Sequence, residues 1–348
     1  MRWADQSGWD LMFAQAAGVP GLYPAFLTAQ FDIPGADSFT EPGVSRTATI
    51  VNSPDSEFWI VGANIGGWSD PDVAQATQEG IGGILQESPD FYTATILVRE
   101  GSAGRTLSAG PVNVGHLCGG GPRPYLWPCP WKVLPGTELQ ITINQRDTVS
   151  YGVWLTFIGF KRFLDAPPVP TDFLLTPTLV RLLSKYRASG QNVVPVPYWY
   201  PMAFAGNQGR APQATEQQTV SVTEADFALC HLAAFVSDPE DGTGWFNANT
   251  IDDNAHQSTV APPFPGRGMA LETIRLVTGL GRIKLDDRPV ILGNLFGTGR
   301  KIGRYPYPLL IPKNDSLTAL VKFADSSTGE NAPLRCDLTF GGARLVAP

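Results

Sequence analysis

The feature that most constrains this chain is an internal repeat, because short motifs of its first half return in the same order in its second half. The sequence PVNVGHLCG begins at Pro111, and PVILGNLFG begins at Pro289, 178 positions later. A Pro-x-Pro motif follows each of them at the same separation, at Pro128 and at Pro306. Ordered repetition at one period is the signature of a duplicated structural unit. The length of 348 residues is close to twice this period, which predicts two copies of one domain.

The matches continue toward the C-terminal end of each half. LQITI at Leu139 corresponds to LTALV at Leu317, again 178 positions apart. LTFIGFK at Leu155 corresponds to LTFGGAR at Leu338, 183 positions apart, so we expect a longer turn before the last strand of the second copy. The residues that define the repeat are Pro111, Gly115, Gly119, Pro128, Pro130 and Gly159 in the first copy and Pro289, Gly293, Gly297, Pro306, Pro308 and Gly342 in the second.

Weaker matches extend the repeat upstream, so that it covers most of the chain. The upstream pairs are YPAF at Tyr23 with YPMAF at Tyr200, EF at Glu57 with DF at Asp226, and FWIV at Phe58 with LCHL at Leu229.

The matched segments alternate between apolar and polar residues, which is typical of half-buried antiparallel strands. The 37 glycines and 31 prolines are spread between these segments, as turns between short strands require. Proline gives no N–H to a sheet, so we expect the Pro-x-Pro motifs to lie in loops. The sequence therefore predicts an all-β fold with two tandem homologous antiparallel β-sandwich, jelly-roll-like domains and one or two short helices.

Two segments have helix signals. Thr176 followed by Pro177 predicts a helix start, and Gly190 predicts its end. Residues 7–17 predict a counterpart near the N-terminus. We expect these helices either to pack within the chain or to reach a neighbouring molecule. The expected organisation is a first repeat over 1–164, a Pro-rich connection with a short helix over 165–217, partly belonging to the second repeat, and a second repeat over 218–348.

Composition narrows the classes of function. Only 16% of the residues are charged, the formal net charge is −7, and no run of Lys and Arg is present, so direct nucleic-acid binding is not expected. No stretch of about 18 apolar residues indicates a membrane span, and the first residues lack the pattern of a signal peptide. In that context we expect Cys118, Cys129, Cys230 and Cys336 to be free thiols.

The sequence offers little that points to catalysis. The three histidines are His116, His231 and His256, and none accompanies a Gly-x-Ser-x-Gly motif. We expect His231, inside an apolar strand, to be structural. Three scattered histidines also argue against an enzyme on a cupin-like scaffold. We therefore predict no catalytic residue, no cofactor and no enzymatic activity.

Metal sites are also not predicted, although two segments contain possible ligands. His116, Cys118 and Cys129 lack a clear fourth ligand for zinc. An acidic cluster runs from Asp238 to Asp241 and recurs at 252–254. Its carboxylates suit Ca²⁺, but the spacing is not that of an EF-hand, and a solvated insertion between strands is the other interpretation.

Aromatic residues provide the candidate interaction surface. If they were exposed, they could adhere to a protein or stack on sugar rings; if buried, they would pack between the sandwiches. A carbohydrate-binding or host-attachment module is therefore the alternative function. The residues of the candidate interaction surface are Trp127, Trp131, Tyr198, Trp199 and Tyr200. Those expected to stack on sugar rings under the alternative are Trp127, Trp131, Trp154, Trp199 and Tyr198.

Two jelly-roll-like copies, low charge, Pro-rich connections and no catalytic set together resemble bacteriophage virion proteins. These include double jelly-roll capsid proteins and capsid decoration, head-fibre and neck proteins. The resemblance is architectural and implies a non-enzymatic structural protein of the virion, assembled in the host cytoplasm. It implies contacts with other copies, as a trimer or another homo-oligomer, and with other virion proteins, with a glycan as a further partner under the alternative. Three chains of two equal domains would place six domains around one axis.

Overall fold

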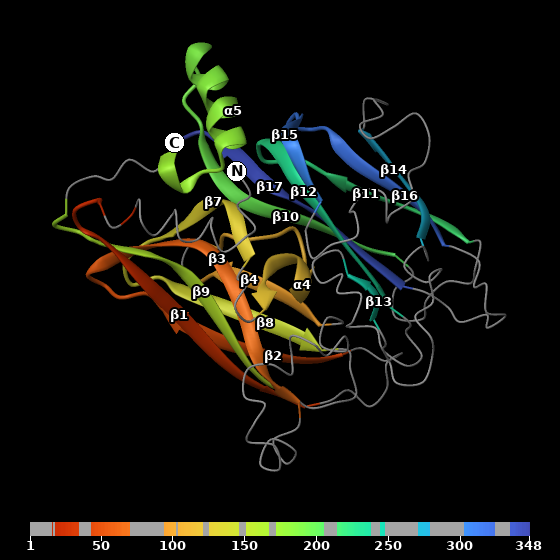
Figure 1. Ribbon diagram of the computed structural model, residues 1–348, viewed down its shortest axis with the longest axis horizontal. Helices are drawn as coiled ribbons and strands as arrows, with labels where there is room; N and C mark the ends of the chain where they lie inside the picture. Colours follow the sequence, from red (N-terminus) through yellow and green to blue (C-terminus); the bar gives the residue numbers. More distant parts are fainter. Residues whose placement is uncertain are drawn as a thin grey trace.

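The computed structural model consists of two β-sandwiches that lie against one another (Figure 1). It describes residues 16, 18–34, 43–69, 94–101, 104–120, 125–145, 151–166, 172–204, 214–237, 244–247, 271–278, 303–323 and 335–348.

The first sandwich pairs a sheet in the order β1-β9-β3, which β6 and β7 extend, with a sheet in the order β2-β8-β4-β5. All pairings are antiparallel except that of β3 with the two-residue strand β6. The strands are β1 (Leu22–Ile33), β2 (Val44–Val51), β3 (Ser56–Ser69), β4 (Thr95–Glu100), β5 (Val112–Asn113), β6 (Gly119–Gly120), β7 (Tyr125–Val133), β8 (Glu138–Gln145) and β9 (Tyr151–Phe163).

The second sandwich pairs a sheet in the order β10-β17-β12, which β13 and β15 extend, with a sheet in the order β11-β16-β14. Its first strand, β10, lies inside the segment 165–217 that we expected to form the connection. The strands are β10 (Val194–Phe204), β11 (Thr215–Ser221), β12 (Asp226–Ser237), β13 (Gly244–Asn247), β14 (Leu271–Thr278), β15 (Gly303–Ile311), β16 (Ser316–Phe323) and β17 (Arg335–Val346).

The strand order of the first sandwich returns in the second. β1-β9-β3-β7 corresponds to β10-β17-β12-β15, and β2-β8-β4 corresponds to β11-β16-β14. In each sandwich the first and last strands are neighbours. The predicted fold class, all-β with antiparallel β-sandwiches and few helices, is confirmed.

The strand register corrects two of the upstream sequence matches. Ala25 pairs with Gly159 in β9, and Tyr198 pairs with Gly342 in β17, so Ala25 and Tyr198 are counterparts. Pro24 therefore corresponds to Pro197, not to Pro201. The separation differs from strand to strand because the turns between strands differ in length, and a comparison at one fixed offset cannot follow it.

The same correction applies to β3 and β12. Phe58 pairs with Lys161, and Phe227 pairs with Arg344 at the counterpart position. The match of Glu57-Phe58 with Asp226-Phe227 is therefore in register. The match of Phe58 with Leu229 is wrong by two residues.

The Pro-x-Pro motifs lie inside strands, which corrects the prediction that they form loops. β7 pairs with β3 at Trp131 and again at Leu126, and the four residues between them, which include Pro128 and Pro130, leave the ladder. β15 repeats this interruption between Leu309 and Arg304, around Pro306 and Pro308. An edge strand at a bulge tolerates proline because no ladder hydrogen bond is lost there.

Gly159 and Gly342 occupy the counterpart position opposite these bulges. A Cβ at Gly159 would collide with the carbonyl oxygen of Trp59, and a Cβ at Gly342 would collide with that of Ala228. Both positions require glycine because a neighbouring backbone approaches closely.

Helix α5 (Pro177–Ala188) begins after Thr176 and ends before Gly190, which has a φ of 77°, so this helix is confirmed where the sequence predicts it. Its buried residues Leu179 and Leu183 pack in one cluster with Cys129 and Ala228, so α5 packs within the chain. The short helices α4 (Val114–Leu117) and η2 (Asp172–Leu174) complete the described helical segments. The N-terminal helix expected over 7–17 lies outside the described residues, apart from Ala16.

Candidate functional site

The two sandwiches meet along a buried junction, which we take as the candidate functional site. Trp199 of β10 has no exposed surface and belongs to the core cluster of the first sandwich. Its ring lies 5.2 Å from that of Trp127 in β7, at an interplanar angle of 68°. Ala233 of β12 joins the same cluster. The core of the first sandwich therefore continues into the second, so the junction has the character of an interior.

Backbone hydrogen bonds reinforce the junction at the edge of β10. The N–H of Trp199 donates to the carbonyl of Leu107 at 3.2 Å, and the N–H of Ala109 donates to the carbonyl of Trp199 at 2.9 Å. The segment around Leu107 thus occupies the free edge of β10. This pairing satisfies backbone groups that burial would otherwise leave without partners.

Polar side chains cross the junction beside these aromatic residues. His116 of α4 lies with its Nδ1 2.8 Å from the hydroxyl of Thr339 in β17. Asn113 donates to the carboxylate of Asp337 at 3.4 Å. The Tyr125 hydroxyl lies 2.8 Å from Nε2 of His231. Each pair joins one residue of each sandwich, which fixes the register of the contact.

Burial lowers the pKa of His116 to about 4, against the opposing effects of Asp337 and the Ala234 carbonyl. The imidazole is therefore neutral at pH 7. His231, the predicted structural histidine, is buried and hydrogen-bonded to Tyr125, and its ring covers Gly341. Both histidines thus serve the junction.

Arg344 of β17 is held by aromatic rings of β10. Its guanidinium lies 3.2 Å from the centroid of the Tyr198 ring and forms an ion pair with Glu224. Burial raises the pKa of both Tyr198 and Tyr200, although the nearby Arg344 opposes this shift. These tyrosines are therefore neutral packing groups that solvate a buried cation.

The five aromatic residues expected as an interaction surface are buried. Because these residues pack between and within the sandwiches, none of the five can stack on a ligand. The prediction that they form an exposed patch is therefore wrong. The residues are Trp127, Trp131, Tyr198, Trp199 and Tyr200.

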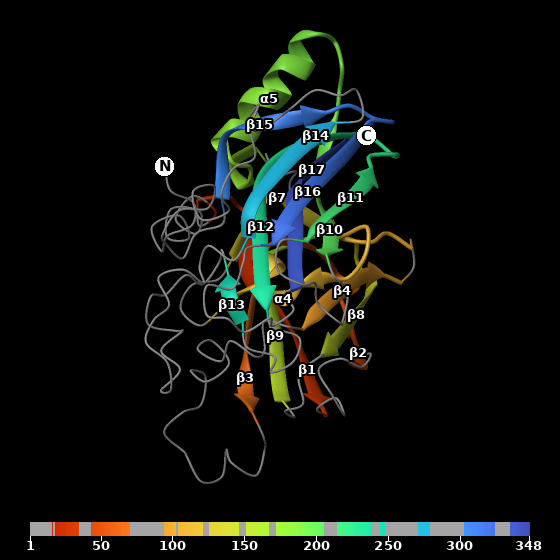
Figure 2. The ribbon, with the colours of Figure 1, turned by 90° about the vertical axis from the view of Figure 1, so that its right-hand side faces the viewer.

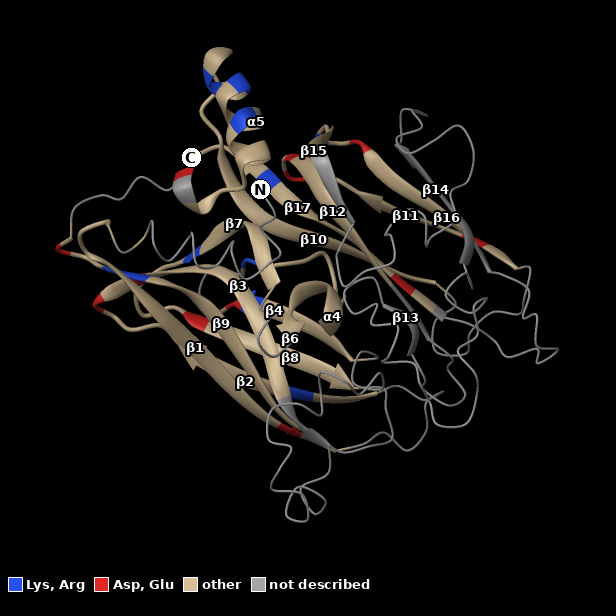
Figure 3. Ribbon diagram, viewed as in Figure 1, with Lys and Arg blue, Asp and Glu red and all other residues tan. Residues whose placement is uncertain are grey.

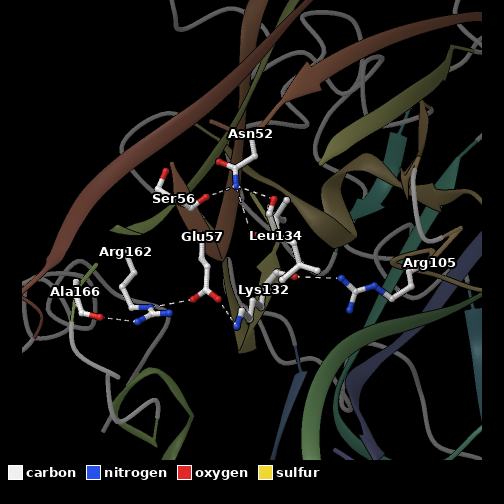
Figure 4. A network of polar contacts seen from close by, with 9 residues as sticks. Asn52, Ser56, Glu57, Arg105, Lys132, Leu134, Arg162 and Ala166 are labelled. Atoms are coloured by element: carbon white, nitrogen blue, oxygen red, sulfur yellow. Dashed lines mark hydrogen bonds and ion pairs between the residues drawn. The ribbon is translucent and has the colours of Figure 1, made fainter. Parts of the chain in front are cut away.

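A network of ion pairs closes the end of the first sandwich near Glu57 (Figure 4). Glu57 lies between Lys132, at 2.5 Å, and Arg162, at 2.9 Å. Burial would raise the pKa of Glu57, but the hydrogen bonds from Arg162 and Lys132 outweigh it and lower the pKa. Nearby, the Asn52 amide donates to the carbonyls of Ser56 and Leu134. The network ties β3, β7 and β9 together, and we assign it to stability.

Candidate metal and thiol chemistry finds no support in the parts of the chain that the structure describes. No group of three or more His, Cys, Asp or Glu side chains there is arranged to hold a metal ion. The four cysteines are free, and burial raises the pKa of Cys118 and Cys129, which disfavours reactive thiolates. His256, the acidic clusters at 238–241 and 252–254, and the repeat residues Pro289, Gly293 and Gly297 lie outside the described residues.

The remaining repeat residues have structural positions. Gly115 lies in α4, Gly119 begins β6, and Pro111 precedes β5. Among the described helices, none has the length and apolar character to cross a bilayer.

Apolar side chains of β1 are exposed on both faces of the sheet. Phe26, on the outer face, is 60% exposed. Tyr23, which the alternation places on the other face, is 53% exposed, and its ring packs against Phe163 with centroids 5.7 Å apart. The charged side chains are scattered over the described elements (Figure 3). Our sequence analysis missed the exposed position of Phe26, although the alternation of β1 places Phe26 on the opposite face from the buried Ala29 and Phe31.

No protein-family model matches the chain, and no curated protein does. PBCV-1 VP54, whose crystal structure was fitted into a cryo-EM reconstruction of the virophage Sputnik, is 10% identical, with 94% of this chain and 98% of that chain covered and a TM-score of 0.36. A Sputnik virophage structure from cryo-EM is 10% identical, with 91% of this chain and 85% of that chain covered and a TM-score of 0.27. The CUB1-EGF-CUB2 domain of human MASP-1/3 is 11% identical, with 92% of this chain and 99% of that chain covered and a TM-score of 0.19. These low TM-scores carry no argument about the function of this chain.

Proposed function

We propose that this chain is a non-enzymatic structural component of a virus particle, which forms or decorates the capsid through contacts between copies of itself. The observation that carries the proposal is the buried junction between two sandwiches of the same strand order. The junction makes one building block with two equivalent parts. Such a block suits static assembly, which needs broad contacts and a fixed shape.

The number of sandwiches per chain favours a trimer. Three copies would place six equivalent sandwiches around one axis, which fits a hexagonal position in a shell. The low share of charged residues, 16%, also favours large permanent contacts, because obligate interfaces are more apolar than transient ones. A decoration, head-fibre or neck role in a bacteriophage, assembly in the host cytoplasm and contacts with other virion proteins are the finer parts of this proposal.

The alternative as a carbohydrate-binding module has lost its stated basis. It required at least two of Trp127, Trp131, Trp154, Trp199 and Tyr198 to share an exposed groove. Trp154 is half-buried and the other four are buried. We therefore retain the structural role as the single proposed function.

The test is the mass of the native particle in solution. Size-exclusion chromatography with light scattering, followed by native mass spectrometry, should give a homo-oligomer, with a trimer of the 37.4 kDa chain as the expected species. Electron microscopy of the same fraction should show closed rings or shells. A protein that stays monomeric at high concentration would overturn the proposal.

A further inference from the structure

The counterpart of Trp199 in the first sandwich is Phe26. Trp199 pairs with Gly341, directly after the Tyr198–Gly342 pair, and Phe26 pairs with Ile158, directly after the Ala25–Gly159 pair. Both residues therefore lie at the same height of the same strand and point to the same side of the sheet.

Their surroundings differ completely. Trp199 has no exposed surface because the first sandwich covers it, whereas Phe26 is 60% exposed. The neighbouring position repeats the contrast, since Pro197 is buried and its counterpart Pro24 is exposed. The strands that pair with β1 and β10, which are β9 and β17, show the same contrast in exposure.

On these partner strands, Thr339 of β17 is buried beneath His116, and its counterpart Thr156 of β9 is only half-buried. Thr156 lies 3.2 Å from the hydroxyl of the exposed Thr28. We call the surface formed by Pro24, Phe26, Thr28 and Thr156 the β1 face. It is the counterpart of the surface that the first sandwich covers on the second. Its β1 residues are exposed, whereas Ile158 and Phe160, beside them on β9, are buried in a cluster with Ala16 and Leu174.

The backbone of β1 matches as well. Trp199 directs its N–H and its carbonyl away from β17, toward the carbonyl of Leu107 and the N–H of Ala109, respectively. Because register and strand direction are the same, Phe26 directs the same two groups away from β9. An exposed apolar side chain therefore coincides at Phe26 with a strand edge that no other described strand pairs with. The counterpart edge, at Trp199, is the one that the junction occupies.

We propose that a second copy of this chain covers the β1 face, using the edge of its second sandwich that contains β15. The argument for this occupant is the junction itself. The edge that contains β7 covers β10, and β15 is the counterpart of β7, with the same interruption of its ladder. The contact between copies would repeat the contact within the chain.

The position of the two surfaces permits a head-to-tail contact. β1 runs along the lower left of Figure 1, while the second sandwich lies at the upper right, and Figure 2 also separates β1 from β15. Contacts of this type between unlike surfaces close into rings when the rotation allows it. This inference rests on the proposed function and names the surface through which the assembly would form.

The test places a charge on the β1 face. In Phe26→Asp, a carboxylate would have to be buried in the contact, so the oligomer should dissociate to the mass of a single chain, with its melting temperature as a monomer little changed. The matched control is Gln30→Asp, on the same strand and the same side. Its counterpart Ala203 is exposed in the second sandwich, so this position lies outside the repeated contact and the variant should assemble normally.

A rescue variant and a local probe separate contact from folding. Phe26→Trp introduces the residue that fills the counterpart position and should assemble as the unchanged protein does. Hydrogen exchange at the backbone amide of residue 26 should be slow in the oligomer of the unchanged protein. It should be at least tenfold faster at the same amide in Phe26→Asp. If the unchanged protein forms an oligomer and Phe26→Asp forms it equally well, the proposed surface is wrong while the structural function stands. If the unchanged protein is a monomer, the proposed function itself fails.

Discussion

The imidazole Nδ1 of His116 lies 2.8 Å from the hydroxyl of Thr339, a residue 223 positions away that belongs to the other sandwich. His116 is completely buried, and Asp337 lies near it. A titratable group thus stands in the contact that joins the two halves of the molecule. Its protonation state is coupled to the stability of that contact.

This coupling predicts an acid-sensitive junction. Burial lowers the pKa of His116 from 6.5 to about 4 in the folded chain, so the unfolded chain binds a proton more readily between these values. Stability is therefore greatest above pH 6.5 and falls by about 1.4 kcal/mol per pH unit as the pH drops toward 4. Urea unfolding of the protein from pH 4 to pH 8 should show this slope.

His116→Asn should be less stable at pH 7 by about 1–3 kcal/mol, because packing and a hydrogen bond are lost. It should also lose the slope between pH 4 and pH 6.5. Thr339→Val is the control, since it removes the hydrogen-bond partner but keeps the buried imidazole and therefore the slope. An unchanged slope in His116→Asn would show that another group is responsible.

Alanine at either repeated glycine should impair folding. In Gly159→Ala and Gly342→Ala the new Cβ would collide with a carbonyl oxygen of the adjacent strand, so each should lose about 1–3 kcal/mol or more. Thermal melting followed by circular dichroism measures the loss. Gly66→Ala in β3 is the matched control, because nothing lies within 4 Å of its added Cβ. Equal tolerance at all three positions would contradict the close approach.

Trp199→Ala should weaken the junction more than either sandwich. Removing a fully buried tryptophan costs about 3–5 kcal/mol, and here the lost contacts are those with Trp127 across the junction. We expect calorimetry to resolve two unfolding transitions in place of one. Val194→Ala, on the same strand at a position 44% exposed, should melt as the unchanged protein does. A single transition in Trp199→Ala at an unshifted temperature would count against the junction.

Glu57→Gln should destabilise the first sandwich by about 1–3 kcal/mol, because two cations lose their buried partner. Since the folded pKa of Glu57 lies below its usual 4.5, its contribution is present above that pH and is lost as the pH falls through the folded value. Asp172→Asn removes a pair with Arg187 that is about half exposed and should cost under about 1 kcal/mol. Denaturant unfolding at pH 7 and pH 3 distinguishes the two, and similar losses at both pH values would exclude an ionic role for Glu57.

Several features could be predicted from the sequence because they depend on local chemistry. Alternation around Leu139 indicates a strand whatever it pairs with, and Thr176, Pro177 and Gly190 carry the signals of a helix start and end. Repetition of motifs indicated that the strand order would recur, since similar segments in the same order build the same ladder.

Other features depended on pairing. The sequence predicted the Pro-x-Pro motifs to be loops. It could not show the bulges of β3 and β12 that accommodate them, because these bulges arise only when the strands pair. The upstream sequence matches were misaligned because turns of different length change the separation between the two copies. Only the strand register shows that Pro24 and Pro197 are counterparts.

The amino-acid sequence by itself determined that this protein is built of strands, that its pattern occurs twice, and where its one described long helix begins and ends. Only the tertiary structure decided that Trp199 is interior while its counterpart Phe26 is surface. The reason is physical: periodicity specifies which side of a sheet a residue faces, but burial depends on what another part of the chain places against that side.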